Sequence, residues 1–257
     1  MTLLMSDNVD RCFENCPPRQ FMPALCRIFI DETAPISVLE ASARAMTYYM
    51  EVSNECSRRI TAVDGTVKAI CDRISNMTTD PGASRELVEQ CVKVLEHICQ
   101  RETGLVYEAG GFSKILSLVR DYGNVIHKDT LRSAMTVITR LCSKIEPDDA
   151  VQADYSVTLG TLLNHNDLRV SESALRSIAA VVDRFLRKYM DPCEFASRCG
   201  LVDLLLGLIV EPSGESTSGE EQSFVLTGKP ISFISIVLSL LSNLCRGSAT
   251  ATDLVVR

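Results

Sequence analysis

A nine-residue pattern recurs along the chain and limits the folds it can adopt more than any other feature. Each copy starts with a small or apolar residue, has apolar residues at places two, five and eight, and ends in Cys or another apolar residue. Apolar residues three or four places apart lie on one face of an α-helix, so each copy predicts a helix with one buried side. The five copies are Ser42–Met50 (SARAMTYYM), Cys91–Cys99 (CVKVLEHIC), Ala134–Cys142 (AMTVITRLC), Ala174–Val182 (ALRSIAAVV) and Val237–Cys245 (VLSLLSNLC).

A second, shorter apolar helix is predicted before each copy, with breakers such as Thr79–Gly82 and Asp121–Asn124 between the two. Such a helix–turn–helix unit cannot bury its apolar faces alone and has to stack on its neighbours. A period of about 43 residues is typical of the armadillo or HEAT class rather than of shorter helical repeats. The preceding helices are predicted at Ala24–Ile30, Val67–Ile74, Ile115–Val119, Leu159–Leu163 and Leu204–Ile209.

The predicted fold is therefore all-α, an armadillo/HEAT-like α-solenoid in which about five helical repeats form a right-handed superhelix over residues 1–257. The step between the last two copies is longer than the others. It contains Glu211–Pro230, a polar stretch rich in Gly, Ser and Glu, which we expect to be a flexible inserted loop at 211–230.

Glycine recurs shortly before the first apolar helix of a repeat, at Gly65, in the pair Gly110-Gly111 and at Gly200. A repeated position indicates a sharp bend between helices, where φ becomes positive or a side chain would clash. A phosphate-binding loop would need further glycines, a preceding strand and a following Lys and Ser/Thr. We therefore expect no nucleotide, no other small-molecule ligand and no cofactor.

The chain has 11 cysteines, an odd number without an export signal, which indicates reduced thiols rather than a disulfide framework. Cys12 and Cys16 have a spacing that a metal site can use, but no second pair or nearby His completes a tetrahedral set, so we expect no metal. A packing role is predicted for the cysteines inside apolar helical patterns, namely Cys26, Cys71, Cys91, Cys99, Cys142 and Cys245.

The charge and hydropathy of the chain argue against two classes of partner, nucleic acid and the membrane. The net charge of -7 and the lack of a dense Lys/Arg block argue against nucleic acid. The longest apolar run, Ile231–Cys245, is too short and too rich in serine to span a membrane, and residues 1–10 do not resemble a secretory signal. We expect a chain of the cytoplasm, with the nucleus as a second compartment.

The seventh place of the repeated pattern gives the candidate binding residues. In stacked helical repeats the final helices line one side, where exposed positions form a ladder that can anchor an extended peptide. An ordinary solvated surface is an equally good interpretation of these residues. The candidate partner-binding ladder is Tyr48, His97, Arg140 and Asn243, with Ala180 at the fourth repeat.

Longer segments carry a resemblance to a known family. Glu108–Phe112 followed by Ile115–Leu118 resembles the inter-helix junction of armadillo repeats, and Ser242–Cys245 resembles the end of their third helix. The chain as a whole resembles the N-terminal armadillo region of a large HECT-type E3 ubiquitin ligase that also carries ankyrin repeats. The segments that resemble that region are Leu3–Phe29, Ala43–Ile60, Glu89–Gly111, His127–Met135 and Leu240–Ser248.

This resemblance implies a protein-interaction scaffold that recruits substrates or regulators, while a HECT domain outside these 257 residues transfers ubiquitin through a cysteine thioester. No catalytic residue is expected in this chain. Two alternatives stay open: a free-standing armadillo adaptor without ubiquitin chemistry, and a direct activity from a convergent nucleophile. Apolar ends at Leu3–Met5 and Asp253–Val256 favour a piece of a longer protein, or are simply frayed termini.

Overall fold

The structure is a computed structural model that describes residues 16–53, 55–79, 84–152, 155–212, 224–226 and 228–256. The chain divides into two compact units, Met1–Leu141 and Cys142–Arg257, and each is described by itself. Cys12, whose spacing from Cys16 was noted above, lies outside the described residues.

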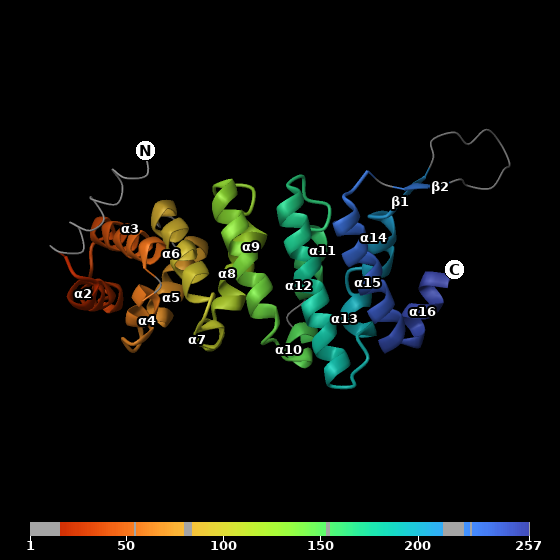
Figure 1. The fold of residues 1–257 in the computed structure, drawn as a ribbon, viewed down its shortest axis with the longest axis horizontal. Coiled ribbons are helices and arrows are strands. Elements are labelled where there is room, and N and C mark those ends of the chain that lie inside the picture. Colours follow the sequence, from red (N-terminus) through yellow and green to blue (C-terminus); the bar gives the residue numbers. More distant parts are fainter. Residues whose placement is uncertain are drawn as a thin grey trace. The chain divides into compact units, whose positions relative to one another are not determined.

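Unit 1 consists of helices that alternate between two layers (Figure 1). In one layer α3 packs beside α6, and in the other α2 packs beside α5, which packs beside α8. The short helices α4 and α7 connect the layers, so that each complete repeat has three helices. The elements are α2 (Pro18–Ile30), α3 (Ile36–Val52), α4 (Glu55–Thr61), α5 (Thr66–Thr79), α6 (Arg85–Ile98), α7 (Thr103–Glu108), α8 (Gly111–Tyr122) and α9 (Lys128–Cys142), the last ending at the first residue of unit 2.

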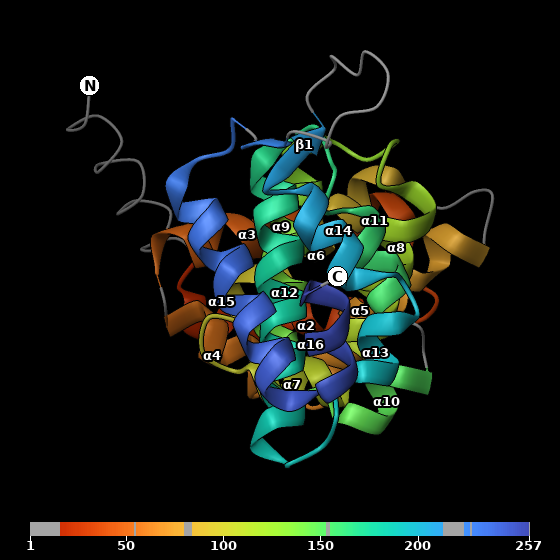
Figure 2. The same cartoon turned by 90° about the vertical axis from the view of Figure 1, so that its right-hand side faces the viewer.

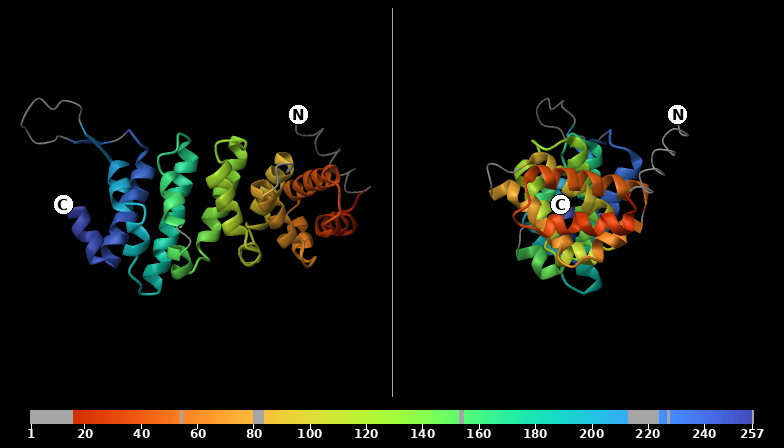
Figure 3. Two further views of the ribbon diagram at one scale, coloured as in Figure 1. Left: turned by 180° about the vertical axis from the view of Figure 1, so that it is seen from behind. Right: turned by 90° about the vertical axis from the view of Figure 1, so that its left-hand side faces the viewer.

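Unit 2 repeats the scheme. Its third helices α12 and α15 lie side by side, and so do its second helices α11 and α14 (Figure 2). The rear view in Figure 3 shows the helices of both units from the other side. The elements are α10 (Pro147–Gln152), α11 (Tyr155–Thr161), α12 (Leu168–Arg187), α13 (Cys193–Ser197), α14 (Leu201–Gly207), α15 (Ile231–Gly247) and α16 (Ala249–Val256).

Four copies of the nine-residue pattern lie inside third helices, and the copy Cys91–Cys99 extends one residue past the end of α6. The all-α fold class is confirmed. The short first helix that the sequence allowed as a third member of the repeat is present as α4 and α7 in unit 1 and as α10 and α13 in unit 2. The sequence analysis placed a loop over residues 211–230, whereas Val210–Pro212 (β1) and Phe224–Leu226 (β2) pair as antiparallel strands, with Glu211 opposite Val225. Residues 213–223, the centre of the predicted loop, lie outside the described residues.

The core of each unit follows the repeated pattern. The fifth place of every copy is at most 6 % exposed, as the predicted apolar stripe requires. The second place departs from the prediction in the last copy, where Leu238 is 54 % exposed. Removing a fifth-place side chain from water stabilises the fold by about 1.5–3 kcal/mol. The five fifth-place residues are Met46, Leu95, Ile138, Ile178 and Leu241.

Polar contacts join residues one repeat apart and set the register between neighbouring helices. In unit 1 the Lys114 ammonium of α8 bonds the Asp72 carboxylate of α5. Burial raises the pKa of Asp72, but hydrogen bonds from Lys114 and Lys68 outweigh that effect and leave the pKa below its usual value. In unit 2 the Glu146 carboxylate bonds Arg184 of α12 at 2.9 Å.

The glycine pair before α8 performs two tasks. Gly110 has φ of +73°, in the left-handed region that side chains disfavour, as predicted from its repeated position. Gly111 has ordinary φ, but a Cβ there would lie 2.6 Å from Val106 Cγ1 and 2.7 Å from its carbonyl oxygen. The first glycine therefore supplies the turn, and the second allows α7 and α8 to approach closely.

Replacing each glycine separates these two effects. Gly110→Ala should lower the free energy of unfolding by about 1 kcal/mol through backbone strain alone. Gly111→Ala should lower it further, by about 1–3 kcal/mol or more, because packed atoms have to move. Gly104→Ala in α7 is the control: its Cβ would meet nothing within 4 Å, so it should be neutral or stabilising. Urea unfolding measures all three, and a Gly111→Ala variant as stable as the control would contradict the close approach.

Candidate functional site

The third helices α3, α6 and α9 carry the candidate residues of unit 1. Two polar contacts join α3 to α6: Arg44 forms an ion pair with Glu86, and the Thr47 hydroxyl lies 3.2 Å from Gln90 Oε1. The two ion-pair side chains are each about half exposed, so the pair adds at most about 1 kcal/mol to stability. We call the exposed side of α3, α6 and α9 the third-helix face.

The structure places Tyr48 and His97 at different levels of this face. Tyr48 is 40 % exposed on α3, and its ring meets Tyr49 edge-on at 6.2 Å between centroids. Its neighbour Thr47 contacts Gln90, whereas the half-buried His97 is seven residues farther along α6. At 1.5 Å per helical residue this offset is about 10 Å. The two side chains are therefore not a contact pair, and a ligand that touches both has to be extended.

Arg140 contacts the end of α6, two residues from His97 in the sequence. From α9 its Nη1 donates to the Cys99 carbonyl at 3.2 Å, and Cys99 is the residue that ends α6. A cation at the carbonyl end of a helix is favoured by the helix dipole. Arg140 therefore helps to hold α9 against α6 in addition to its predicted role on the surface.

Asn243 belongs to unit 2, on α15, and is half-buried. Its Oδ1 accepts a hydrogen bond from Arg246 Nη2. Both residues line a cavity of about 710 Å³ within unit 2.

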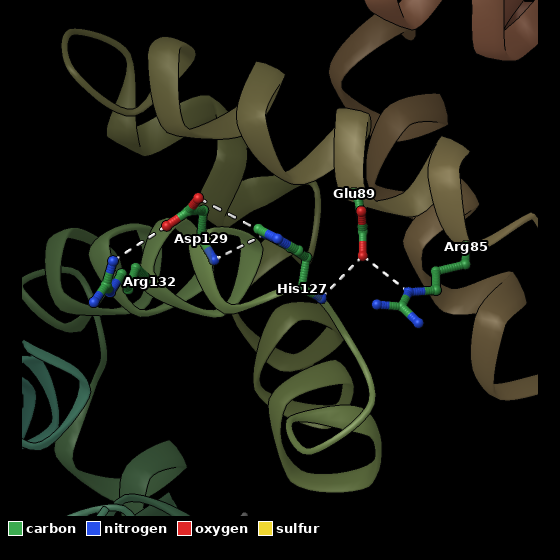
Figure 4. Close-up of polar contacts among 5 residues, drawn as sticks. All are labelled: Arg85, Glu89, His127, Asp129 and Arg132. Carbon is green, nitrogen blue, oxygen red and sulfur yellow. Dashed lines mark hydrogen bonds and ion pairs between the residues drawn. The ribbon is translucent and has the colours of Figure 1, made fainter. Parts of the chain in front are cut away.

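Sequence reasoning did not identify a polar cluster where α6 meets the start of α9 (Figure 4). Glu89 Oε1 accepts from the His127 backbone N–H and from Arg85 Nε, both at 3.0 Å. His127 Nδ1 in turn accepts from the Asp129 backbone N–H at 3.3 Å, and Asp129 bonds Arg132 at 3.2 Å. Glu89 thus caps α9 from the preceding repeat. The sequence contains no local signal for this contact, since the two residues are 38 positions apart.

Most thiols of the apolar patterns are buried, in agreement with a packing role: Cys26, Cys71, Cys91, Cys99 and Cys142 are buried, and Cys245 is half-buried. Burial raises the pKa of Cys71, Cys99 and Cys142 to about 12, so these thiols stay protonated at neutral pH. Within the described ranges no group of His, Cys, Asp or Glu has the arrangement of a metal site. The helices in that same part of the chain are all too short or too polar to cross a membrane.

Comparison with known proteins identifies the relatives of this chain. It is 55 % identical over 256 residues to the E3 ubiquitin-protein ligase hecd-1 of Caenorhabditis elegans and 45 % identical over 294 residues to the E3 ubiquitin-protein ligase Ufd4 of Drosophila melanogaster. The chain is homologous over its whole length to a segment of these HECT-type ligases. It spans only 9 % of the first and 11 % of the second.

The resemblance to ubiquitin ligases that the sequence indicated is thus confirmed. No protein-family model matches the chain. Among solved structures, computationally designed armadillo repeat proteins for modular peptide recognition share its fold, with a TM-score of 0.65 and 14 % identity over 91 % of this chain and 86 % of theirs.

Glu89 provides a test of the contact between α6 and α9. Glu89→Ala should lower the free energy of unfolding by about 1–2 kcal/mol, because a carboxylate only 20 % exposed accepts two hydrogen bonds. Hydrogen exchange in the first turn of α9 should also become faster. Glu86→Ala, which removes only a half-exposed ion pair, is the control and should cost under about 0.5 kcal/mol. Equal effects of the two substitutions would contradict the capping role.

The raised thiol pKa values predict a loss of stability in alkali. Above pH 9, the usual pKa, the Cys142 thiol ionises in the unfolded chain but stays protonated in the fold up to about pH 12. Stability should therefore fall by about 1.4 kcal/mol per pH unit for this thiol between those values, and not below pH 9. Unfolding of Cys142→Ala should depend less steeply on pH in that window. Val182→Ala removes buried carbon at the matching repeat position and should keep the wild-type slope.

Proposed function

We propose that this chain is a protein-interaction scaffold within a HECT-type E3 ubiquitin ligase, where it recruits substrates or regulators for ubiquitin transfer carried out elsewhere in the protein. The observation that carries the proposal is the similarity over the whole chain to two ligases of which it covers about a tenth. Such a fraction corresponds to one region of a larger enzyme. We propose the cytoplasm, and also the nucleus, as its compartments.

The thiols of the described residues support a binding role rather than a catalytic one. Ubiquitin transfer through a thioester needs an accessible thiolate. The buried cysteines instead have raised pKa values with burial as the main cause, and Cys71, Cys99 and Cys142 reach about 12. These buried thiols are therefore unsuited to the transfer, whereas Cys16, Cys193, Cys199 and Cys245 are only half-buried. We assign the transfer to a part of the protein outside this chain because the chain is similar to a small segment of two ligases.

The third-helix face supports recognition of an extended segment of a partner protein. Tyr48 and His97 are offset along the helices, and Arg140 lies at the end of α6, so contacts with all three require several residues of partner. Aromatic and Arg side chains are the residue types that contribute most to binding energy at interfaces. The designed armadillo proteins that share this fold were made for peptide recognition, and we extend that use to this face.

Capture by the third-helix face tests the proposal. Proteins cross-linked to the wild-type chain in lysate should be identified and compared with those bound by a variant carrying Tyr48→Ala, His97→Ala and Arg140→Lys. The variant should lose about tenfold or more of the specific partners, because its aromatic and bidentate contacts are gone. Arg140→Lys keeps a cation at the end of α6, which limits the loss of stability.

The matched control replaces Arg58, Ser113 and Arg120, three exposed residues of first and second helices, by Ala, and should retain the partners. The captured proteins should also lose ubiquitin conjugates in cells whose own gene carries the variant. Unchanged capture would remove the third-helix face from the proposal. If capture is lost but the conjugates are unchanged, and immunoblots show a native polypeptide near 28.3 kDa, the chain is an adaptor without ubiquitin chemistry.

A further inference from the structure

Tyr189, at the end of α12, combines an exposed aromatic side chain with a left-handed backbone. Its side chain is 99 % exposed, so it contributes almost nothing to the core. Its φ is +56°, in the left-handed region that costs a side chain about 1 kcal/mol or more. Among the described residues with positive φ, the other three are glycines: Gly65, Gly110 and Gly200.

The turn itself explains the backbone but not the tyrosine. The Tyr189 N–H donates to the Leu186 carbonyl at 3.1 Å, and the Met190 N–H donates to the Phe185 carbonyl at 2.9 Å. This pair of bonds is the Schellman arrangement that ends helices, and its left-handed residue is usually Gly. Glycine at position 189 would satisfy the same two bonds without strain. An exposed aromatic ring therefore stands where stability alone favours glycine.

The same turn forms one wall of the 710 Å³ cavity in unit 2, which is a suitable volume for a few residues of peptide. Leu186 and Met190 give it apolar lining, and α15 contributes Arg246 and Gly247. A side chain at Gly247 would collide with Leu186, since its Cβ would lie 2.5 Å from Leu186 Cδ2. This close approach brings α15 against the end of α12 and joins the two halves of the cavity wall.

The charged side chains that line the cavity differ in their hydrogen-bond partners. Arg187 is held by Asp183 at 2.7 Å, and Asp191 accepts the Cys193 backbone N–H at 2.7 Å. Arg246, which is exposed, donates to the neutral amide oxygen of Asn243. The side-chain amide of Asn243 also carries an NH₂ group, which is a further donor in the lining. The lining holds two Asp and two Arg and is neutral overall, but of its two arginines only Arg187 has a carboxylate partner among the described residues. The Arg246 guanidinium is therefore the group of the lining that can donate to a carboxylate ligand.

We propose that this cavity binds an acidic segment of a partner protein, with an Asp or Glu carboxylate on Arg246 and an adjacent apolar side chain against Tyr189 and Leu186. The inference rests on the protein-interaction role proposed above and assigns a partner chemistry to unit 2. Tyr and Arg are, with Trp, the residue types enriched among the energetic anchors of interfaces. The loss of stability at Tyr189 is then the cost of keeping an anchor at the cavity rim.

The role of Tyr189 is tested by a substitution that should raise stability and weaken binding. Random nine-residue peptides displayed on phage are selected against the wild-type chain, and the enriched peptides are synthesised with a fluorescent label. Tyr189→Gly should raise the melting temperature by a few degrees and weaken binding of these peptides about tenfold. A variant that is more stable and binds equally well would overturn the role of Tyr189, since a purely structural residue gives that result.

Peptide chemistry tests the acidic partner. The enriched peptides should share an Asp or Glu, and changing it to Asn or Gln should weaken binding about tenfold. Arg246→Gln should weaken binding to the same extent, whereas Arg176→Gln, an exposed arginine of α12 outside the cavity, should not. Failure to enrich any peptide, or equal binding of acidic and amide peptides, would overturn this inference. Partner capture through Tyr48, His97 and Arg140 would be unaffected, so the two proposals fail independently.

Discussion

Burial of the fifth-place side chains between neighbouring helices is the interaction on which each unit depends. A third helix such as α6 has one apolar side, and Leu95 on that side is fully buried. A helix of this kind is not stable alone in water, because ordering its backbone costs more than one repeat can recover. Stacking of successive repeats is thus a condition for folding, and the layers of each unit follow from it.

Polar contacts between repeats set the register of the stacked helices. Apolar packing is weakly directional, whereas the bonds of Glu89 to the start of α9 and of Arg140 to the end of α6 define where one helix begins relative to another. Some of the residues that make these contacts are ones that the sequence predicts to be free surface residues. Arg140 has both a structural and a proposed binding role for this reason.

The two units use their exposed sides differently. In unit 1 the third-helix face is polar and its residues are spread along the helices, which suits an extended partner. In unit 2 the turn at Tyr189 and the close approach at Gly247 border an open cavity. The left-handed turn at Tyr189 ends α12, but its exposed aromatic side chain adds almost nothing to the core of unit 2. This combination therefore points to selection for contact with another molecule.

The sequence by itself determined the helical repeats, the buried stripe and the left-handed glycines, because these depend on local periodicity and backbone sterics. It also identified the ligase relatives through extended segments. Only the tertiary structure decided that Tyr48 and His97 lie two helical turns apart, that Glu89 caps α9, and that Tyr189, Asn243 and Arg246 border one cavity. Such contacts join residues about 40 or more positions apart. Their geometry depends on how the repeats stack, which no local pattern encodes.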